Sequence, residues 1–213
     1  MSAARGLISD FGGVLTSPLA GAFAQVQAEG GVPVAALGQA MAVVSGADGA
    51  HPLFELECGR LTERDFLTRL EGALEPILGH PVSLAEFPER YFAGLSPNPE
   101  LFDYYREVHG RGVRLSLCTN NVREWEPRWR PMFPFDDIFT DVVDSGFVGL
   151  RKPDPAIYAL TLERMGLPAA DVVFVDDVEI NIDAAREAGM RAVHFETNEQ
   201  AIPLIEAALA RDD

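Results

Sequence analysis

The 213-residue sequence predicts an α/β fold, a doubly wound parallel sheet with an inserted α-helical domain. Two observations lead to this fold class. In the second half of the chain, short apolar strands alternate with helical segments, which is typical of a parallel sheet covered by helices on both faces. Between the first strand and the second lie about eighty residues with helix-like apolar spacing, which predict a separate helical unit.

Several short apolar segments have the composition of strands. The N-terminal strand is predicted over residues 5–11, and it stops at the Gly12-Gly13 pair because adjacent glycines interrupt strands. The segment 172–175 is apolar throughout, as expected for a strand that is buried on both faces. The remaining strands are predicted over residues 113–118, 138–143 and 191–195.

The inserted block contains its own helix signals. Thr62 followed by Asp65 marks a helix start, because the threonine hydroxyl accepts a hydrogen bond from the backbone N–H three residues on. We therefore expect an inserted domain over residues 17–96, and a core made of residues 1–16 and 97–213. Helices of the inserted domain are predicted over residues 18–29, 33–45, 62–74 and 83–92.

The core helices also have recognisable ends. One is expected to begin at Pro155, with Asp154 as its N-cap, and to stop at Gly166. Proline suits the first helical position because its missing N–H would have no partner there. The other core helices are predicted over residues 100–109 and 180–188.

Charge and cysteine content limit the classes of partner. The chain has 17 basic and 33 acidic residues, a net charge of −16, which repels nucleic acid and anionic membranes. Cys58 and Cys118 form no framework of pairs and are expected to be buried thiols. Residues 1–5 contain no export signal, and no apolar run approaches a membrane span, so we predict a cytoplasmic location. We also predict a monomer or a homodimer.

Polar residues stand where several predicted strands end. Because the carboxyl ends of parallel strands meet at one edge of the sheet, we expect these side chains to lie together, with Lys152 reaching them from a loop. The set contains acids, a hydroxyl, an amide and an ammonium group. Its members are Asp10, Thr119, Asn120, Lys152, Asp176 and Asp177.

This set of groups suits phosphoryl transfer. A lysine and a hydroxyl can hold the phosphoryl oxygens, and the work of such a site is mostly positioning and charge neutralisation. Mg²⁺ prefers oxygen ligands, which Asp10 and Asp177 offer. A carboxylate such as Asp10 can attack phosphorus and form an aspartyl-phosphate that water then hydrolyses.

Four segments resemble the motifs of the haloacid dehalogenase-like hydrolase superfamily, in that family's order: residues 10–16, 117–120, 152–155 and 175–181. The resemblance implies a Rossmann-like core. The inserted helices resemble the helical C1 cap of subfamily I. Residues 57–62 are similar to a cap turn of the branch that includes the phosphatase domain of soluble epoxide hydrolase and glucose-1-phosphate phosphatases.

The resemblance also implies roles for individual residues. Asp10 would be the nucleophile and a magnesium ligand, together with Asp177 and the backbone carbonyl of Gly12. Asp176 and Asn181 would hold waters or side chains around the metal. Thr119, Asn120 and Lys152 would bind the phosphoryl group, with Thr119 and Lys152 taking part in catalysis. The expected function is magnesium-dependent hydrolysis of a small phosphorylated metabolite, for which a sugar phosphate is one candidate.

Gly12 departs from the family pattern. Many family phosphatases carry an aspartate at this position, which protonates the leaving oxygen and is worth about 10²- to 10⁴-fold in rate. We therefore expect the substrate to have a good leaving group, which needs no proton donor. Alternatively, the inserted domain, which would act as a lid, or the substrate itself supplies the proton to the leaving oxygen. Asn121, Arg123 and Trp125 follow the second motif closely enough to contact the site. In the inserted domain, His51, Arg60 and Arg64 are candidate specificity residues, but a surface position is the favoured interpretation of each.

Three alternatives follow from the same residues. A metal-independent 2-haloacid dehalogenase would use the same nucleophile, but that branch typically has an aromatic residue where Gly12 stands. A weakly active or non-catalytic phospho-ligand-binding homologue would explain the missing acid. A receiver-type signalling domain uses similar groups, but there the acidic pair comes first in the chain.

Overall fold

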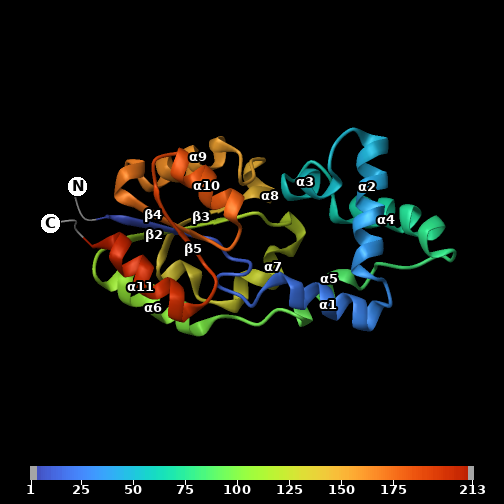
Figure 1. The fold of residues 1–213 in the computed structure, drawn as a ribbon, viewed down its shortest axis with the longest axis horizontal. Helices are drawn as coiled ribbons and strands as arrows, with labels where there is room; N and C mark the ends of the chain where they lie inside the picture. Colours follow the sequence, from blue (N-terminus) through green and yellow to red (C-terminus); the bar gives the residue numbers. More distant parts are fainter. Residues whose placement is uncertain (1–3, 211–213) are drawn as a thin grey trace.

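The computed structural model describes residues 4–210, and its centre is a five-stranded sheet (Figure 1). The strand order is β3-β2-β1-β4-β5, and every neighbouring pair is parallel. The strands are β1 (Gly6–Ser9), β2 (Arg114–Thr119), β3 (Phe139–Asp144), β4 (Val172–Asp176) and β5 (Arg191–His194). The predicted fold class, a doubly wound parallel α/β sheet, is confirmed. The ends of the predicted core, residues 1–3 and 211–213, lie outside the described residues.

Helices cover both faces of the sheet. Successive side chains of a strand point to opposite faces, so Val173 packs with α6 (Pro99–Gly110) and α11 (Asn198–Leu209), while Phe174 packs with α9 (Pro155–Met165) and α10 (Glu179–Glu187). Figure 1 shows α9 and α10 on one side and α6 and α11 on the other. This two-sided burial explains why β4 is apolar throughout.

The segment between β1 and β2 folds into a helical group with its own core. It extends from one end of the α/β part in Figure 1. Its helices are α1 (Leu19–Gly30), α2 (Val34–Asp48), α3 (Pro52–Glu57), α4 (Glu63–Leu78) and α5 (Phe87–Ala93). Thr16 and Pro97 form an isolated antiparallel bridge where the chain leaves and re-enters the α/β part. This bridge supports our proposal that the inserted domain spans residues 17–96. We call this inserted domain the cap.

Two helix starts have the capping that the sequence predicts. The Thr62 hydroxyl accepts a hydrogen bond from the backbone N–H of Asp65 at 3.1 Å, at the start of α4. The Asp154 carboxylate accepts one from the N–H of Ala156 at 2.9 Å, at the start of α9. Such caps each contribute about 1 kcal/mol to helix stability.

Helices α3 and α11 were not expected from the sequence. Helix α3 has six residues, too few to display a helical period. Helix α11 contains Pro203, which reads as a helix breaker, but the helix begins normally, with Thr197 accepting from the N–H of Gln200. Short elements that the sequence did not predict lie between β2 and β3: α7 (Glu126–Trp129) and the 3₁₀ turns Arg123–Trp125, Arg130–Met132 and Phe135–Asp137. The short helix α8 (Ser145–Val148) follows β3, and the 3₁₀ turn Ala169–Asp171 precedes β4.

Both cysteines are free and buried, as expected. Within residues 4–210, no single helix is long and apolar enough to span a bilayer. Helices α1 and α2 reach that length only together, across a bend of 100°.

Candidate active site

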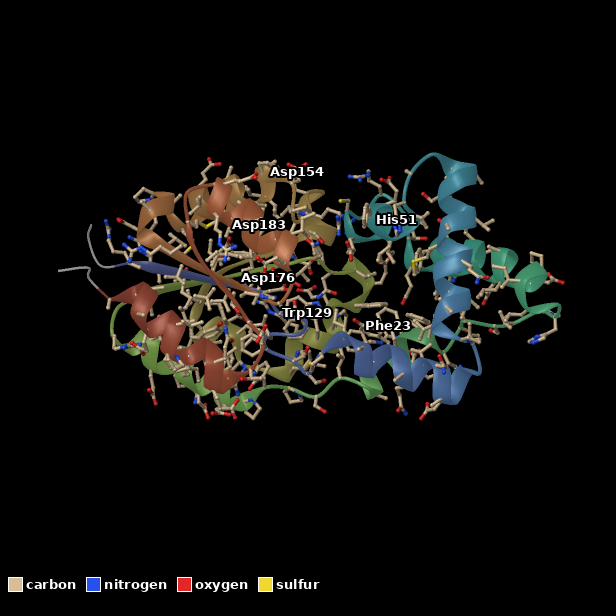
Figure 2. All side chains as sticks on the ribbon, viewed as in Figure 1. Phe23, His51, Trp129, Asp154, Asp176 and Asp183 are labelled. Carbon is tan, nitrogen blue, oxygen red and sulfur yellow. The ribbon has the colours of Figure 1, made fainter. Side chains whose placement is uncertain are left out.

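The predicted acids meet at the carboxyl edge of the sheet, because β2, β1 and β4 are neighbours. Asp10 follows β1, Thr119 ends β2 and Asp176 ends β4. The backbone N–H of Asp10 donates to the carbonyl of Val175 at 2.8 Å, so the nucleophile candidate is tied to the end of β4. Figure 2 labels Asp176 inside the α/β part, near the middle of the molecule.

Lys152 is the only lysine in the chain, and it lies in this site. Its Nζ is 2.8 Å from Oδ1 of Asp10 and 2.6 Å from Oδ2 of Asp176, and its side chain is 1% exposed. Burial lowers the pKa of Lys152, but the two carboxylates outweigh burial, and the net pKa is raised. The ammonium group therefore stays charged between its two acidic partners.

Asn120 holds the loop that carries Lys152. The backbone N–H of Lys152 donates to Oδ1 of Asn120 at 2.8 Å, and Nδ2 of Asn120 donates to the carbonyl of Lys152 at 2.9 Å. This reciprocal pair fixes the lysine loop against the end of β2. Because the Asn120 side chain is engaged there, its backbone N–H is the group left to meet a ligand.

Three carboxylates surround the lysine. Oxygens of Asp10, Asp176 and Asp177 all lie within 4.8 Å of one another. Asp176 is already bonded to the protein, since its Oδ1 accepts from the N–H of Val178 at 2.9 Å and from Nδ2 of Asn181 at 3.0 Å. Asp10 and Asp177 therefore remain as the carboxylates available to a cation.

The charge balance of the site also favours a bound cation. Burial raises the pKa of Asp10 to about 7; Asp176 and Asp177 add to this shift, and Lys152 opposes it. Burial, followed by the charge of Asp176, raises the pKa of Asp177 as well. One lysine does not neutralise three carboxylates, and a hard divalent cation with oxygen ligands fits this site.

Gly13 makes room for Asp177. Its φ is +79°, and a Cβ added there would overlap the Asp177 carboxylate. Gly13→Ala is expected to lower the free energy of unfolding by about 1–3 kcal/mol, because alanine is strained at this φ and displaces the partly buried Asp177. The measurement is urea denaturation.

The matched control for Gly13→Ala is Gly72→Ala. Gly72 lies within α4, where an added Cβ meets nothing within 4 Å. Alanine is expected to raise stability there by up to about 1 kcal/mol. If both variants changed stability alike, the close approach of Gly13 to Asp177 would be wrong.

A side chain of the cap lies beside Gly12, the position at which many family phosphatases carry an acid. A Cβ on Gly12 would lie 3.2 Å from Cδ2 of Leu19, at the start of α1. The backbone of Gly12 is not in the left-handed region, so conformation alone does not require glycine here. An apolar side chain thus stands where a family aspartate would need space.

The candidate neighbours of the site divide into two groups. Asn121 and Trp125 line a cavity beside Gly12, Thr119 and Asn120. The others make contacts outside that lining. Arg60 pairs with Glu55, His51 stacks on Phe54, Arg64 is exposed and Arg123 donates to the Gly146 carbonyl.

Sequence reasoning missed Glu57 and Tyr91 in this cavity. Glu57 joins cap to core, with Oε2 2.7 Å from Nε of Arg151, and burial raises its pKa. Glu57 ends the short helix α3, whose length hid it, and Tyr91 belongs to α5. The one available signal was that residues 57–62 resemble a family cap turn.

Comparison with known proteins gives a family match and several relatives. A family model of haloacid dehalogenase-like hydrolases matches residues 4–189. The sesquiterpene phosphatase astK of Aspergillus oryzae is 32% identical over 108 residues, 47% of this chain and 52% of that protein. The phosphoserine phosphatase of Thermus thermophilus is 33% identical over 137 residues, 63% of this chain and 54% of that protein. The chain thus matches about half the length of these relatives.

Solved structures share the fold along nearly the whole chain. A predicted haloacid dehalogenase-like hydrolase from Porphyromonas gingivalis has a TM-score of 0.74 at 22% identity, covering 99% of this chain and 100% of that one. A family enzyme from Bacteroides thetaiotaomicron, solved with magnesium and inorganic phosphate, has a TM-score of 0.65 at 19% identity, covering 92% and 96%. At these identities the likeness concerns the fold.

Proposed function

Because this chain belongs to the haloacid dehalogenase-like hydrolases, we propose that it is a magnesium-dependent phosphatase that acts on a small phosphate monoester through an aspartyl-phosphate on Asp10. The observation that carries this proposal is the buried Lys152, which bridges Asp10 and Asp176 beside the carboxylate of Asp177. Two relatives with phosphatase names support it.

The residues divide the chemical work. A carboxylate oxygen of Asp10 attacks phosphorus, the bond to the ester oxygen breaks, and the ester oxygen leaves as an anion that takes a proton from water. Water then attacks the aspartyl-phosphate, which releases inorganic phosphate and restores the carboxylate. Lys152, the Thr119 hydroxyl and the Asn120 backbone N–H would hold the phosphoryl oxygens during both steps.

The metal assignment rests on the acidic cluster. Asp10, Asp177 and the Gly12 carbonyl would hold magnesium, which when bound supplies positive charge against the phosphoryl oxygens. Asp176 would position Lys152, while Asn181 fixes the Asp176 carboxylate. The family neighbour solved with magnesium and inorganic phosphate supports this choice of metal.

The absence of an acid at Gly12 bears on the substrate. Without a proton donor at this position, we expect esters with good leaving groups, such as acyl and aryl phosphates, to react faster than alkyl esters. Sugar 1-phosphates belong to the same group.

Cytoplasmic location and a monomeric or homodimeric state remain predictions.

Phosphate release with and without metal tests the proposal. The substrates are acetyl phosphate, p-nitrophenyl phosphate, glucose 1-phosphate and glucose 6-phosphate, and the Asp10→Asn protein gives the background. EDTA is expected to lower the rate at least about 100-fold, because a Lewis acid stabilises transition-state charge by several kcal/mol. The p-nitrophenyl ester is expected to react faster than glucose 6-phosphate.

Two outcomes would contradict the proposal. If the wild type releases no more phosphate than Asp10→Asn on every substrate, the chain is not a phosphatase of this kind. If it releases chloride from 2-chloropropionate in EDTA and no phosphate from any ester, the dehalogenase alternative holds.

A further inference from the structure

A cavity of about 180 Å³ lies between the active-site edge of the sheet and the cap. Gly12, Thr119 and Asn120 form part of its wall, so one end adjoins the site of Asp10. The rest of the wall is largely apolar and includes Phe23, Leu56, Phe66, Tyr91, Phe92 and Trp125. Figure 2 labels Phe23 on α1, in the cap. A substrate's leaving group therefore has an apolar space beside the phosphoryl site.

The aromatic wall crosses from cap to core. The Phe23 ring meets the Tyr91 ring edge-on at 5.5 Å, within the cap. The Tyr91 ring lies 5.0 Å from the Trp125 ring, which belongs to the core segment after β2. A group bound in the cavity would thus touch both parts of the molecule, and its apolar contact area would add to the contact between them.

Most polar groups in the lining already have partners. Oδ1 of Asn121 accepts from the N–H of Val122 at 2.9 Å, and Nε1 of Trp125 donates to Glu63 at 2.5 Å. Glu57 is paired with Arg151, and Asn120 is bonded to the Lys152 backbone. Several hydroxyls of a buried sugar would lack partners, and each unpaired hydroxyl lowers affinity by about 5- to 150-fold.

The volume sets the size of the group that fits. An apolar protein cavity of about 150 Å³ holds benzene. The cavity here is slightly larger, at about 180 Å³. A single ring or a branched chain of about five to seven carbons would therefore fill it.

Building on the proposed phosphatase function, we propose that the substrate's leaving group is a hydrocarbon of this size, an aryl group, and not a sugar. The phosphoryl group would lie at Asp10 and Lys152, and the hydrocarbon would occupy the cavity of Phe23, Tyr91 and Trp125. The apolar cavity and the missing acid at Gly12 together narrow the substrate to phosphate monoesters of phenols.

Inhibition by n-alkylphosphonates tests this inference without a leaving-group effect, because the carbon–phosphorus bond is not hydrolysed. Acetyl phosphate is the substrate, since it is too small to fill the cavity. From ethyl- to hexylphosphonate, the inhibition constant is expected to fall about fourfold for each methylene until the cavity is full, and at least about 30-fold in all. Hexylphosphonate is expected to bind more than tenfold tighter than glucose 6-phosphate.

A matched pair of variants tests whether the hydrocarbon chain of the phosphonate binds in the cavity. Met41 lines the cavity and is partly buried. Met41→Gln keeps the length of the side chain but adds polarity, so it is expected to weaken hexylphosphonate about tenfold and ethylphosphonate less than threefold. Met41→Leu, an apolar substitution of similar volume, is expected to change both less than threefold.

The outcomes separate this inference from the function on which it rests. Suppose that acetyl phosphate hydrolysis needs Asp10, as the phosphatase proposal requires. If inhibition is then independent of chain length, or if glucose 6-phosphate binds as tightly as hexylphosphonate, the apolar leaving group alone is overturned. Equal effects of Met41→Gln on the short and the long phosphonate would also overturn it. Absence of any Asp10-dependent phosphate release would instead overturn the phosphatase proposal.

Discussion

Asp10→Asn is expected to reduce phosphate release by about 10⁴-fold or more, because an amide does not attack phosphorus. The fold is expected to survive. The pKa of Asp10 is raised from 3.8 to about 7, so in the metal-free protein its ionised form opposes folding. That cost appears as the pH rises above about 4 and is complete above about 7. At pH 8 without metal, the melting temperature of Asp10→Asn should equal or exceed that of the wild type.

The control for this substitution is Asp183→Asn. Asp183 lies on α10, is largely exposed and pairs with Arg186 at 2.9 Å. Loss of an exposed pair costs about 1 kcal/mol or less, so activity should be unchanged. Rates are measured with acetyl phosphate and excess magnesium. If Asp10→Asn kept more than about one per cent of the wild-type rate while folded, Asp10 would not be the nucleophile.

The core and the site's acids were predictable because their signals are local. Apolar runs mark the strands, and parallel strands bring their carboxyl ends together whatever their order in the sheet. Asp10, Thr119 and Asp176 could thus be grouped although more than a hundred residues separate the first from the others. The capped starts of α4 and α9 were equally visible, since each cap and its partner are two or three residues apart.

The cap cavity was not predictable from the same signals. Phe23, Phe66 and Tyr91 come from three different helices, and only tertiary packing decides that they share one wall. The same holds for Leu19 in front of Gly12. The engagement of the Asn120 side chain with the Lys152 backbone was also hidden, because the partners are 32 residues apart. Sequence patterns locate such residues on elements, but they do not give the facing surfaces.

Lys152→Met is expected to have the second large effect, on stability and on activity together. Without the ammonium group, Asp10 and Asp176 lose the cation between them, and breaking a buried ion pair costs about 3–5 kcal/mol. Activity is expected to fall at least about 10²- to 10³-fold, the effect of removing one donor to the transition-state oxygens. Arginine is not an equivalent substitute, because its wide guanidinium group replaces a compact charge in a fully buried position.

The pH dependence of this variant has a definite sign. Removing Lys152 raises the pKa of Asp10 in the folded state still further above its unfolded value. A raised carboxyl pKa makes stability fall as the pH rises from about 4 to the folded-state pKa. Urea denaturation should therefore show a larger deficit for Lys152→Met at pH 8 than at pH 5.5, and magnesium should recover part of it, since a ligand that binds the folded state stabilises it.

The matched control for Lys152→Met is Arg164→Met. Arg164 is exposed and lies 3.5 Å from the partly buried Asp141. Its loss should cost less than about 1 kcal/mol, with no loss of activity. A deficit of Lys152→Met that does not grow with pH would mean that Asp10 is not ionised beside the lysine. A deficit that grows with pH, together with recovery by magnesium, would mean that lysine and metal neutralise the same carboxylates. The chain's only lysine and the bound cation would then share one electrostatic task.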